Sequence, residues 1–197
     1  MKLRWVGKSI SEMAPRRFGA RGFEMAPRPL RALAFVALVA VLQTSCAVPR
    51  MIWPQENIQA FELNSPKLDK RVLVAARSSE FKDAVVRKVR DSFMEMSVYV
   101  KFIGVDDLEH EKAARYNAVI LVSTCIAGGF DRHIEAFLAR ESDQRNTIVL
   151  TTAGDANWKP DKKGRNYDAI TTASVKTDVD KVASEIVSKV HALLGAS

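Results

Sequence analysis

Five short apolar stretches alternate with longer stretches in which apolar side chains recur at helical spacing. This alternation predicts strands at residues 71–76, 98–103, 118–122, 147–151 and 168–172. It predicts helices at residues 81–96, 106–114, 130–140 and 175–194, the second of them short and charged. Strands that alternate with amphipathic helices form a parallel sheet that is covered on both faces. The predicted class is therefore a doubly wound α/β domain.

One crossover helix is missing from this pattern. Residues 153–166 (AGDANWKPDKKGRN) are too polar and too interrupted to cover a face of a sheet. We predict a long loop here, and long loops in compact domains are often functional. The stretch at 118–122 is the most apolar of the five and is expected to be the central strand.

The charge distribution argues against a nucleic-acid partner. The chain has a formal net charge of +7, and residues 1–50 carry all of it, since residues 51–197 hold equal numbers of acidic and basic side chains. The folded part therefore has no basic excess with which to neutralise phosphates. No metal site is expected either, because His110, His133 and His191 lie far apart in the sequence.

The N-terminal basic segment has the features of an export signal. We predict that residues 1–24 are an upstream extension and that residues 25–45 are a signal peptide; an unusually long basic region is the alternative for 1–24. Arg28 and Arg31 precede an apolar run over 32–42, which is too short for the roughly 20 residues that span a bilayer.

The stretch Leu42-Gln43-Thr44-Ser45-Cys46 resembles a bacterial lipobox, in which the cysteine is acylated and becomes the mature N-terminus. It departs from the usual pattern because Gln43 stands where an aliphatic residue is expected. The resemblance implies a lipid anchor on Cys46 and a domain outside the cytoplasm, at the cell envelope. Plain secretion after cleavage at Ala47 and a retained membrane anchor are the alternatives.

A tether is expected to connect Cys46 to the domain. We assign residues 46–67 to the lipidated cysteine and tether, and residues 68–197 to the domain. Several residues in this stretch, including Met51, Ile52 and Trp53, are too apolar for a free linker. Part of it is expected to lie as a loop on the domain, or on the membrane surface.

The loops that follow the first, third and fourth strands are the candidate ligand site, because ligands of open parallel sheets bind beyond the carboxyl ends of the strands. In the first loop, Arg77, Ser78 and Ser79 at a helix start are suited to holding a phosphate. The alternative is that one of the two serines is a simple N-cap.

The other two loops contribute the remaining candidates. The second contains Thr124, Cys125, Ala127, Gly128 and Gly129, and its glycines permit close backbone approach. The third contains Gly154, Asp155 and Trp158, and its tryptophan either stacks on a planar ligand or covers the sheet where the helix is missing. Cys125 is either a partly buried inert thiol or a group that tunes a cofactor.

These residues carry a family resemblance. The stretch Tyr116–Leu138 resembles the third strand, ligand loop and following helix of flavodoxins, and Gly154-Asp155-x-x-Trp158 is similar to their flavin-stacking loop. The resemblance covers about residues 68–195 and implies strand order 2-1-3-4-5 with FMN as cofactor. It would place the phosphate at Arg77 to Ser79, and the flavin ring between the second loop and Trp158. The first loop departs from the family, because it has no glycine and contains Glu80.

Two functional classes follow. The first is a membrane-anchored electron-transfer protein that binds FMN and meets a redox partner protein. The second is a cofactor-free flavodoxin-like module that binds a partner or has a structural role at the envelope. The fold does not choose between them, and the sequence does not decide whether the chain is an enzyme.

Overall fold

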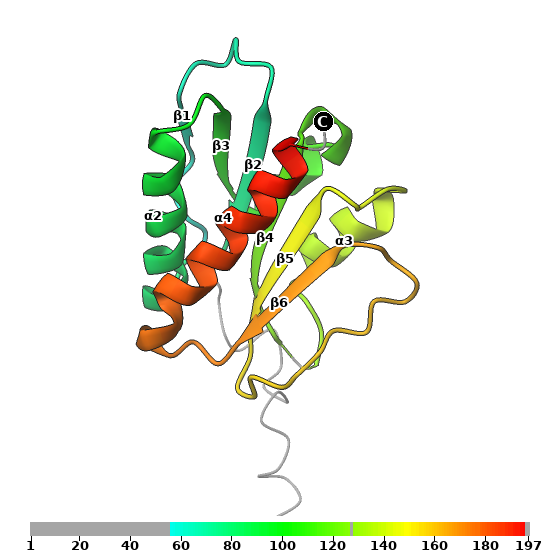
Figure 1. The fold of residues 1–197 in the computed structure, drawn as a ribbon. Helices are drawn as coiled ribbons and strands as arrows, with labels where there is room; N and C mark the ends of the chain where they lie inside the picture. The colour runs from blue at the N-terminus through cyan, green and yellow to red at the C-terminus, as the bar shows by residue number, and fades with distance from the viewer. Residues whose placement is uncertain (1–55, 127, 196–197) are drawn as a thin grey trace, which may run out of the picture. The chain divides into compact units, whose positions relative to one another are not determined.

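The structure is a computed structural model that describes residues 56–126 and 128–195. Six strands form one sheet in the order β1-β3-β2-β4-β5-β6, with β1 antiparallel to β3 and all other pairs parallel (Figure 1). The strands are β1 (Phe61–Leu63), β2 (Arg71–Ala76), β3 (Tyr99–Gly104), β4 (Ala118–Thr124), β5 (Thr147–Thr152) and β6 (Asp168–Thr172). The five predicted strands are confirmed, and the parallel ones lie in the predicted order.

The described residues also form three α-helices and three short 3₁₀ helices. The α-helices are α2 (Glu80–Met94), α3 (Arg132–Arg140) and α4 (Val179–Gly195). The 3₁₀ helices are η1 (Val105–His110), η2 (Ala113–Arg115) and η3 (Lys176–Asp178). The charged helix predicted at 106–114 is therefore two 3₁₀ segments. Helix α4 starts later than predicted, because η3 takes the first turn.

Both faces of the sheet are buried, which explains the continuous apolar strands. Helices α2 and α4 cover one face, over Val74, Ile120 and Leu150 (Figure 1). Helix α3 and the 3₁₀ helices η1 and η2 cover the other face, over Leu73 and Leu121. The alternating side chains of each strand therefore enter two separate cores.

The sixth strand corrects the prediction that the sheet has five strands, and it lies within the stretch 46–67 that was assigned to the tether. Phe61–Leu63 pairs with β3, and the Phe61 ring stacks on that of Phe102 with a centroid distance of 4.2 Å. Asn64 then turns the chain with φ 65°, and its side-chain amide donates to the carbonyls of Phe93 and Val98. Residues 56–67 thus belong to the domain. Because β1 is antiparallel to β3, the sheet is mixed.

The long loop between β5 and β6 has no helix, as predicted. Aromatic side chains cover this part of the sheet instead. Phe130 lies edge-on to Trp158 and to Tyr167, with ring centroids 6.1 and 6.0 Å away, and Tyr167 is fully buried.

The predictions for residues 1–55, which include the signal peptide and Cys46, lie outside the described residues, as does Ala127. Within 56–126 and 128–195, no helix has both the length and the apolar character needed to cross a membrane.

The central position of β4 gives a stability prediction. Val119 is 0% exposed, so Val119→Asp would bury a carboxylate without a partner and lower the free energy of unfolding by several kcal/mol. Val175 is 48% exposed, and Val175→Asp is the matched control, expected to change it by no more than about 0.5 kcal/mol. Urea denaturation measures both variants. A Val119→Asp protein as stable as the control would contradict this placement.

Candidate functional site

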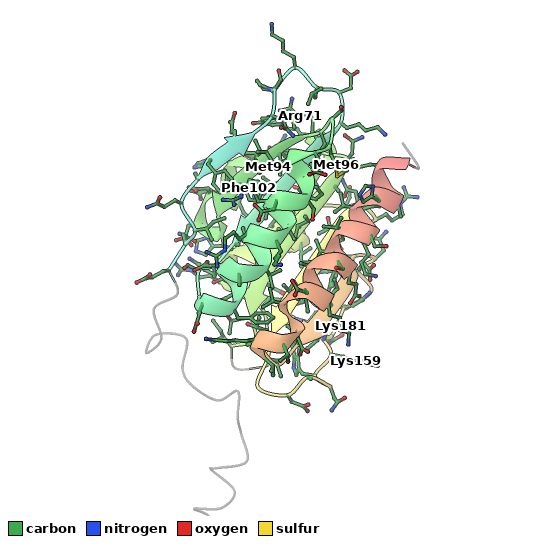
Figure 2. The ribbon with its side chains drawn as sticks, turned by 60° about the vertical axis from the view of Figure 1, so that its left-hand side comes forward. Arg71, Met94, Met96, Phe102, Lys159 and Lys181 are labelled. Carbon is green, nitrogen blue, oxygen red and sulfur yellow. The ribbon has the colours of Figure 1, made fainter. Side chains whose placement is uncertain are left out.

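The three predicted loops meet at one edge of the sheet, beyond the carboxyl ends of β2, β4 and β5. Their backbones are joined by hydrogen bonds: Arg77 N–H donates to the Val122 carbonyl at 3.2 Å, and Cys125 N–H donates to the Thr152 carbonyl at 2.7 Å. Ala153 N–H extends the row to Thr172 at 2.9 Å. Figure 2 shows Lys159 and Lys181 at this end of the domain and Arg71 and Met96 at the opposite end.

Arg77 is directed inward and is only 6% exposed. Its Nε donates to Asp131 Oδ2 at 3.0 Å and its Nη2 to Asp106 Oδ1 at 2.7 Å. Burial disfavours the guanidinium charge, but hydrogen bonds and charge attraction from both carboxylates outweigh burial and raise the pKa of Arg77. The hydrogen bond from Arg77 in turn lowers the pKa of Asp106. The cation predicted to hold a phosphate therefore makes its ion pairs within the protein.

A short segment before β1 is fixed across this edge. We call residues 56–58 the strap. Ser78 N–H donates to the Glu56 carbonyl at 2.7 Å, and Ile58 N–H donates to the Ala76 carbonyl at 3.3 Å. The strap therefore uses a backbone N–H group of the loop that was predicted to bind phosphate.

Asn57 is the centre of the strap. Its Oδ1 accepts from Arg77 Nη1 at 2.8 Å and from Val105 N–H at 2.9 Å, and its Nδ2 donates to Asp106 Oδ2 at 2.8 Å. A Cβ atom added to Gly104 would lie 2.7 Å from Asn57 Cγ, so glycine is what allows this close approach. The sequence analysis treated Asn57 only as part of a tether, because a lone asparagine in an irregular stretch carries no periodic signal.

The serines of the first loop have local structural roles. Ser79 is the N-cap of α2, and its Oγ accepts from Lys82 N–H at 3.4 Å. Ser78 Oγ donates to Asp83 Oδ2 at 2.8 Å. Glu80 lies outside this network, exposed and paired with Lys176 at 2.6 Å. The simpler interpretation of the serines, an N-cap, is confirmed for Ser79.

Lys82 is a site residue that the sequence analysis did not single out. It is 2% exposed, and its Nζ donates to Thr124 Oγ1 at 2.7 Å. Burial, with a smaller contribution from the Arg77 charge, lowers the pKa of Lys82 to about 8 against the opposing effects of Asp83 and Asp131. Buried titratable groups with shifted pKa values mark candidate functional sites.

The second and third loops come together as predicted. Gly128, with φ 76°, and Gly129 face Trp158 across a pocket of about 200 Å³. Asp155 shapes the third loop, since its Oδ1 accepts from Asn157 N–H at 2.8 Å and its carbonyl accepts from Trp158 N–H at 3.1 Å. Of the remaining predicted residues, Gly154 is exposed, Cys125 is half-buried, and Thr124 bonds Lys82.

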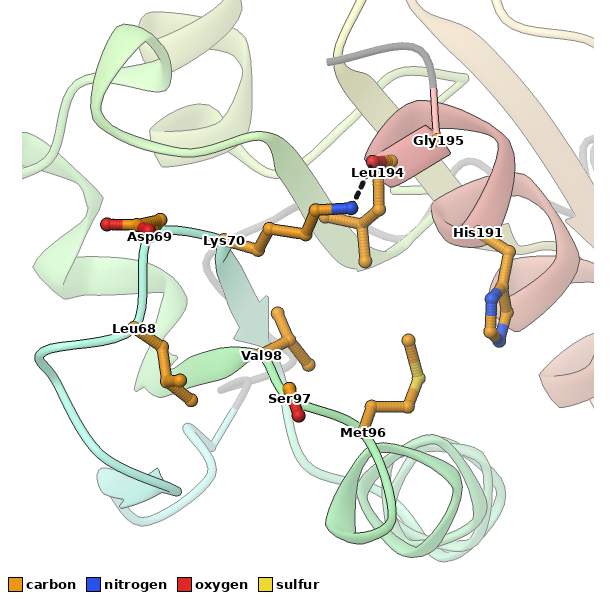
Figure 3. Close-up of a pocket in the computed structure, with 9 residues that line it drawn as sticks. All are labelled: Leu68, Asp69, Lys70, Met96, Ser97, Val98, His191, Leu194 and Gly195. Carbon is orange, nitrogen blue, oxygen red and sulfur yellow. Dashed lines mark hydrogen bonds between the residues drawn. The ribbon is translucent and has the colours of Figure 1, made fainter.

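A larger groove of about 620 Å³ lies at the opposite edge of the sheet (Figure 3). It is formed by the segment before β2, the chain after α2 and the end of α4, where Lys70 Nζ donates to the Leu194 carbonyl at 2.7 Å. None of the predicted site residues within 56–126 and 128–195 lines it. We place the candidate site at the carboxyl edge, because the glycines, the buried cations and the converging loops are there.

Solved structures of a flavodiiron core, an oxidoreductase and a flavodoxin are among those similar to this chain. The flavodiiron core of Flv1 from Synechocystis sp. PCC6803 is 12% identical with a TM-score of 0.50, and the match covers 86% of this chain and 42% of that one. An oxidoreductase from Corynebacterium diphtheriae is 11% identical with a TM-score of 0.47, covering 65% and 98%. A flavodoxin from the domain Archaea is 11% identical with a TM-score of 0.44, covering 62% and 98%.

No protein-family model and no curated protein sequence matches the chain. At 12% identity and a TM-score of 0.50, the similarity to the Flv1 flavodiiron core bears on the fold alone. The chemistry of the site therefore has to be argued from its own residues.

The buried lysine gives a pH-dependent prediction. Because the pKa of Lys82 falls from its usual 10.5 to about 8 on folding, its charge destabilises the native state at pH 7. Lys82→Met should therefore raise the free energy of unfolding by about 1–3 kcal/mol at pH 7. Between pH 8 and 10.5 the native state releases this proton before the unfolded state does. The free energy of unfolding of the wild type therefore rises over this interval, and the stability difference between it and Lys82→Met disappears.

Urea denaturation at several pH values measures this difference. Lys88→Met is the control, because Lys88 lies on the same helix with its side chain exposed and paired with Asp180. Its effect should not change over the same interval, since the Asp180 hydrogen bond raises the pKa of Lys88 above its usual value. A Lys82→Met effect that does not change with pH would contradict the buried-charge assignment.

Proposed function

We propose that this chain is a flavodoxin-like domain that functions without flavin, as a binding or structural module held at the bacterial cell envelope by a lipid on Cys46. The observation that carries the first part is the pairing of Arg77 with Asp106, Asp131 and Asn57. In this arrangement, side chains of the protein already pair with the groups that would have to bind an FMN phosphate.

The charges around the first loop do not suit a phosphate. The Ser78 N–H group is bonded to the strap, and Ser78 Oγ is bonded to the Asp83 carboxylate. Turning Arg77 toward a ligand would leave Asp131, which is 6% exposed, without its buried cation. Breaking a buried ion pair in this way costs about 3–5 kcal/mol, a cost that phosphate contacts would have to offset. The described residues therefore do not fit FMN phosphate.

The second candidate function is electron transfer by bound FMN to a redox partner protein. It is favoured by the pocket that joins Gly128 and Gly129 to Trp158, where the flavin ring was predicted. This pocket of about 200 Å³ is below the roughly 300–1,000 Å³ of most small-molecule sites. The ring would thus have a partial site while the phosphate would lack one, so the cofactor-free function is the better supported of the two.

An FMN titration tests the choice between the candidates. We expect no quenching of FMN fluorescence by the purified protein, which corresponds to a Kd weaker than about 1 mM. The protein as isolated should also have no flavin absorbance. Tight quenching in the wild type would reject the cofactor-free function. In that case Trp158→Ala should weaken binding by at least about 2- to 13-fold, from lost stacking of about 0.5–1.5 kcal/mol.

The lipid anchor is supported by the sequence alone. A basic segment, the apolar run over 32–42 and small residues precede Cys46, and nine residues separate this cysteine from Glu56. Such a short connection would hold the domain close to the membrane, outside the cytoplasm. The strap fixes Glu56 at the carboxyl edge of the sheet, so the connection to Cys46 would start from that edge.

Labelling with radioactive palmitate in a bacterial host tests the anchor. The chain has two cysteines, which makes the control simple. Cys46→Ser should abolish the label, whereas Cys125→Ser should retain it, because Cys125 lies within the folded domain. If both variants are labelled like the wild type, Cys46 is not the acylation site and the anchor is wrong.

A further inference from the structure

The pocket between the second and third loops has the size of a site for a single aromatic ring. We call it the loop pocket; its lining residues are Gly128, Gly129, Phe130, Glu135, Trp158, Pro160, Asp161 and Lys163. Its volume is about 200 Å³, and a cavity of about 150 Å³ is enough to hold benzene. The loop pocket therefore has room for one ring with a short polar extension.

The walls of the loop pocket are held in place by contacts within the protein. In the second loop, Ile126 and Gly129 exchange two backbone hydrogen bonds, of 3.0 and 3.1 Å. Phe130 lies edge-on to Trp158 and is supported from behind by Tyr167. A site formed in advance loses little conformational entropy when a ligand binds, so a small ligand can bind with few contacts.

A tight turn places Lys163 at the rim of the loop pocket. Lys163 has φ 49° and Gly164 has φ 79°, and Arg165 N–H closes the turn on the Lys162 carbonyl at 2.9 Å. This backbone region is unfavourable for lysine, and residues held in it cluster at ligand sites. The Lys163 side chain is 64% exposed, and its Nζ lies 3.9 Å from Glu135 Oε1, beyond hydrogen-bond distance. Its ammonium group therefore has donors to offer a ligand.

The rim also presents carboxylate oxygens. Lys163 and Arg165 both lie against Oε1 of Glu135, at 3.9 and 3.0 Å, and no described residue donates to Oε2. Asp161 Oδ1 accepts from Lys163 N–H at 3.0 Å, and its Oδ2 likewise receives no bond from the described residues. The rim thus combines two anionic acceptors with a cationic donor, next to an aromatic wall.

We propose that the loop pocket binds a zwitterionic aromatic α-amino acid. Its ring would lie against Trp158 and Phe130, and its carboxylate would accept from Lys163. Its ammonium group would donate to Glu135 and Asp161. A ligand with only one sign of charge would face groups of its own sign on the rim, whereas a zwitterion pairs with both. The inference rests on the proposed cofactor-free function and deepens it, because it names the ligand class of the binding module.

L-Phenylalanine is the probe, and two analogues that each lack one charge are its controls. Phenethylamine has no carboxylate, and 3-phenylpropionate has no ammonium group. Saturation-transfer NMR with the purified full-length protein measures the three Kd values. We expect a Kd on the order of 1 mM for L-phenylalanine, and about two- to fivefold weaker binding of each analogue, because each loses an exposed ion pair. No binding of L-phenylalanine, or equal Kd values for all three compounds, would overturn the proposal.

Substitutions in the third loop test the contacts. Trp158→Ala should weaken L-phenylalanine binding by about 2- to 13-fold through lost stacking. Lys163→Gln should weaken it by about two- to fivefold without weakening phenethylamine, a selectivity that a folding defect would not produce. Lys159→Gln is the matched control, because Lys159 is exposed in the same loop and does not line the pocket. If Lys163→Gln binds L-phenylalanine as tightly as Lys159→Gln does, the assigned contact is wrong.

The FMN titration separates this inference from the proposed function. A protein that binds neither FMN nor L-phenylalanine loses this inference alone. A wild type that binds FMN tightly loses the proposed function.

Discussion

The buried guanidinium of Arg77 determines how the carboxyl edge of this sheet is built. It contacts Asp131 at the start of α3, Asp106 in η1 and Asn57 in the strap, so one side chain at the end of β2 joins three segments distant in sequence. A buried cation needs partners on every side, because an unpaired charge in the interior costs several kcal/mol. The positions of these segments are therefore coupled through a single electrostatic requirement.

The parts of the fold that could be predicted are those with a repeating physical cause. The parallel strands are buried on both faces, so each is a continuous apolar run that needs no knowledge of its neighbours. Phe61–Leu63 had no such signal, because three residues at an edge with one ring stacked on Phe102 form no pattern. The loop at 153–166 was recognised because a covering helix needs an apolar stripe, and this segment has none.

The candidate site was predictable in position but not in chemistry. Parallel topology brings the three loops to one edge, and Gly128 and Trp158 do line one pocket. The direction in which Arg77 and Lys82 point depends on partners from other segments, namely Asp131 and Thr124. A lysine among charged neighbours on a helix is typical of a solvated face, and only the tertiary contact with β4 shows that Lys82 is buried.

The strap also has a mechanical consequence. Any pull on the chain preceding Glu56 reaches the bond between the Glu56 carbonyl and Ser78 N–H first, and next the contacts of Asn57. These bonds come before β1 along the chain, so under tension they would break one after another before the force reaches the edge strand. The central parallel strands would bear the force last, so rupture of the strap's bonds would protect the sheet from forces on its N-terminal connection.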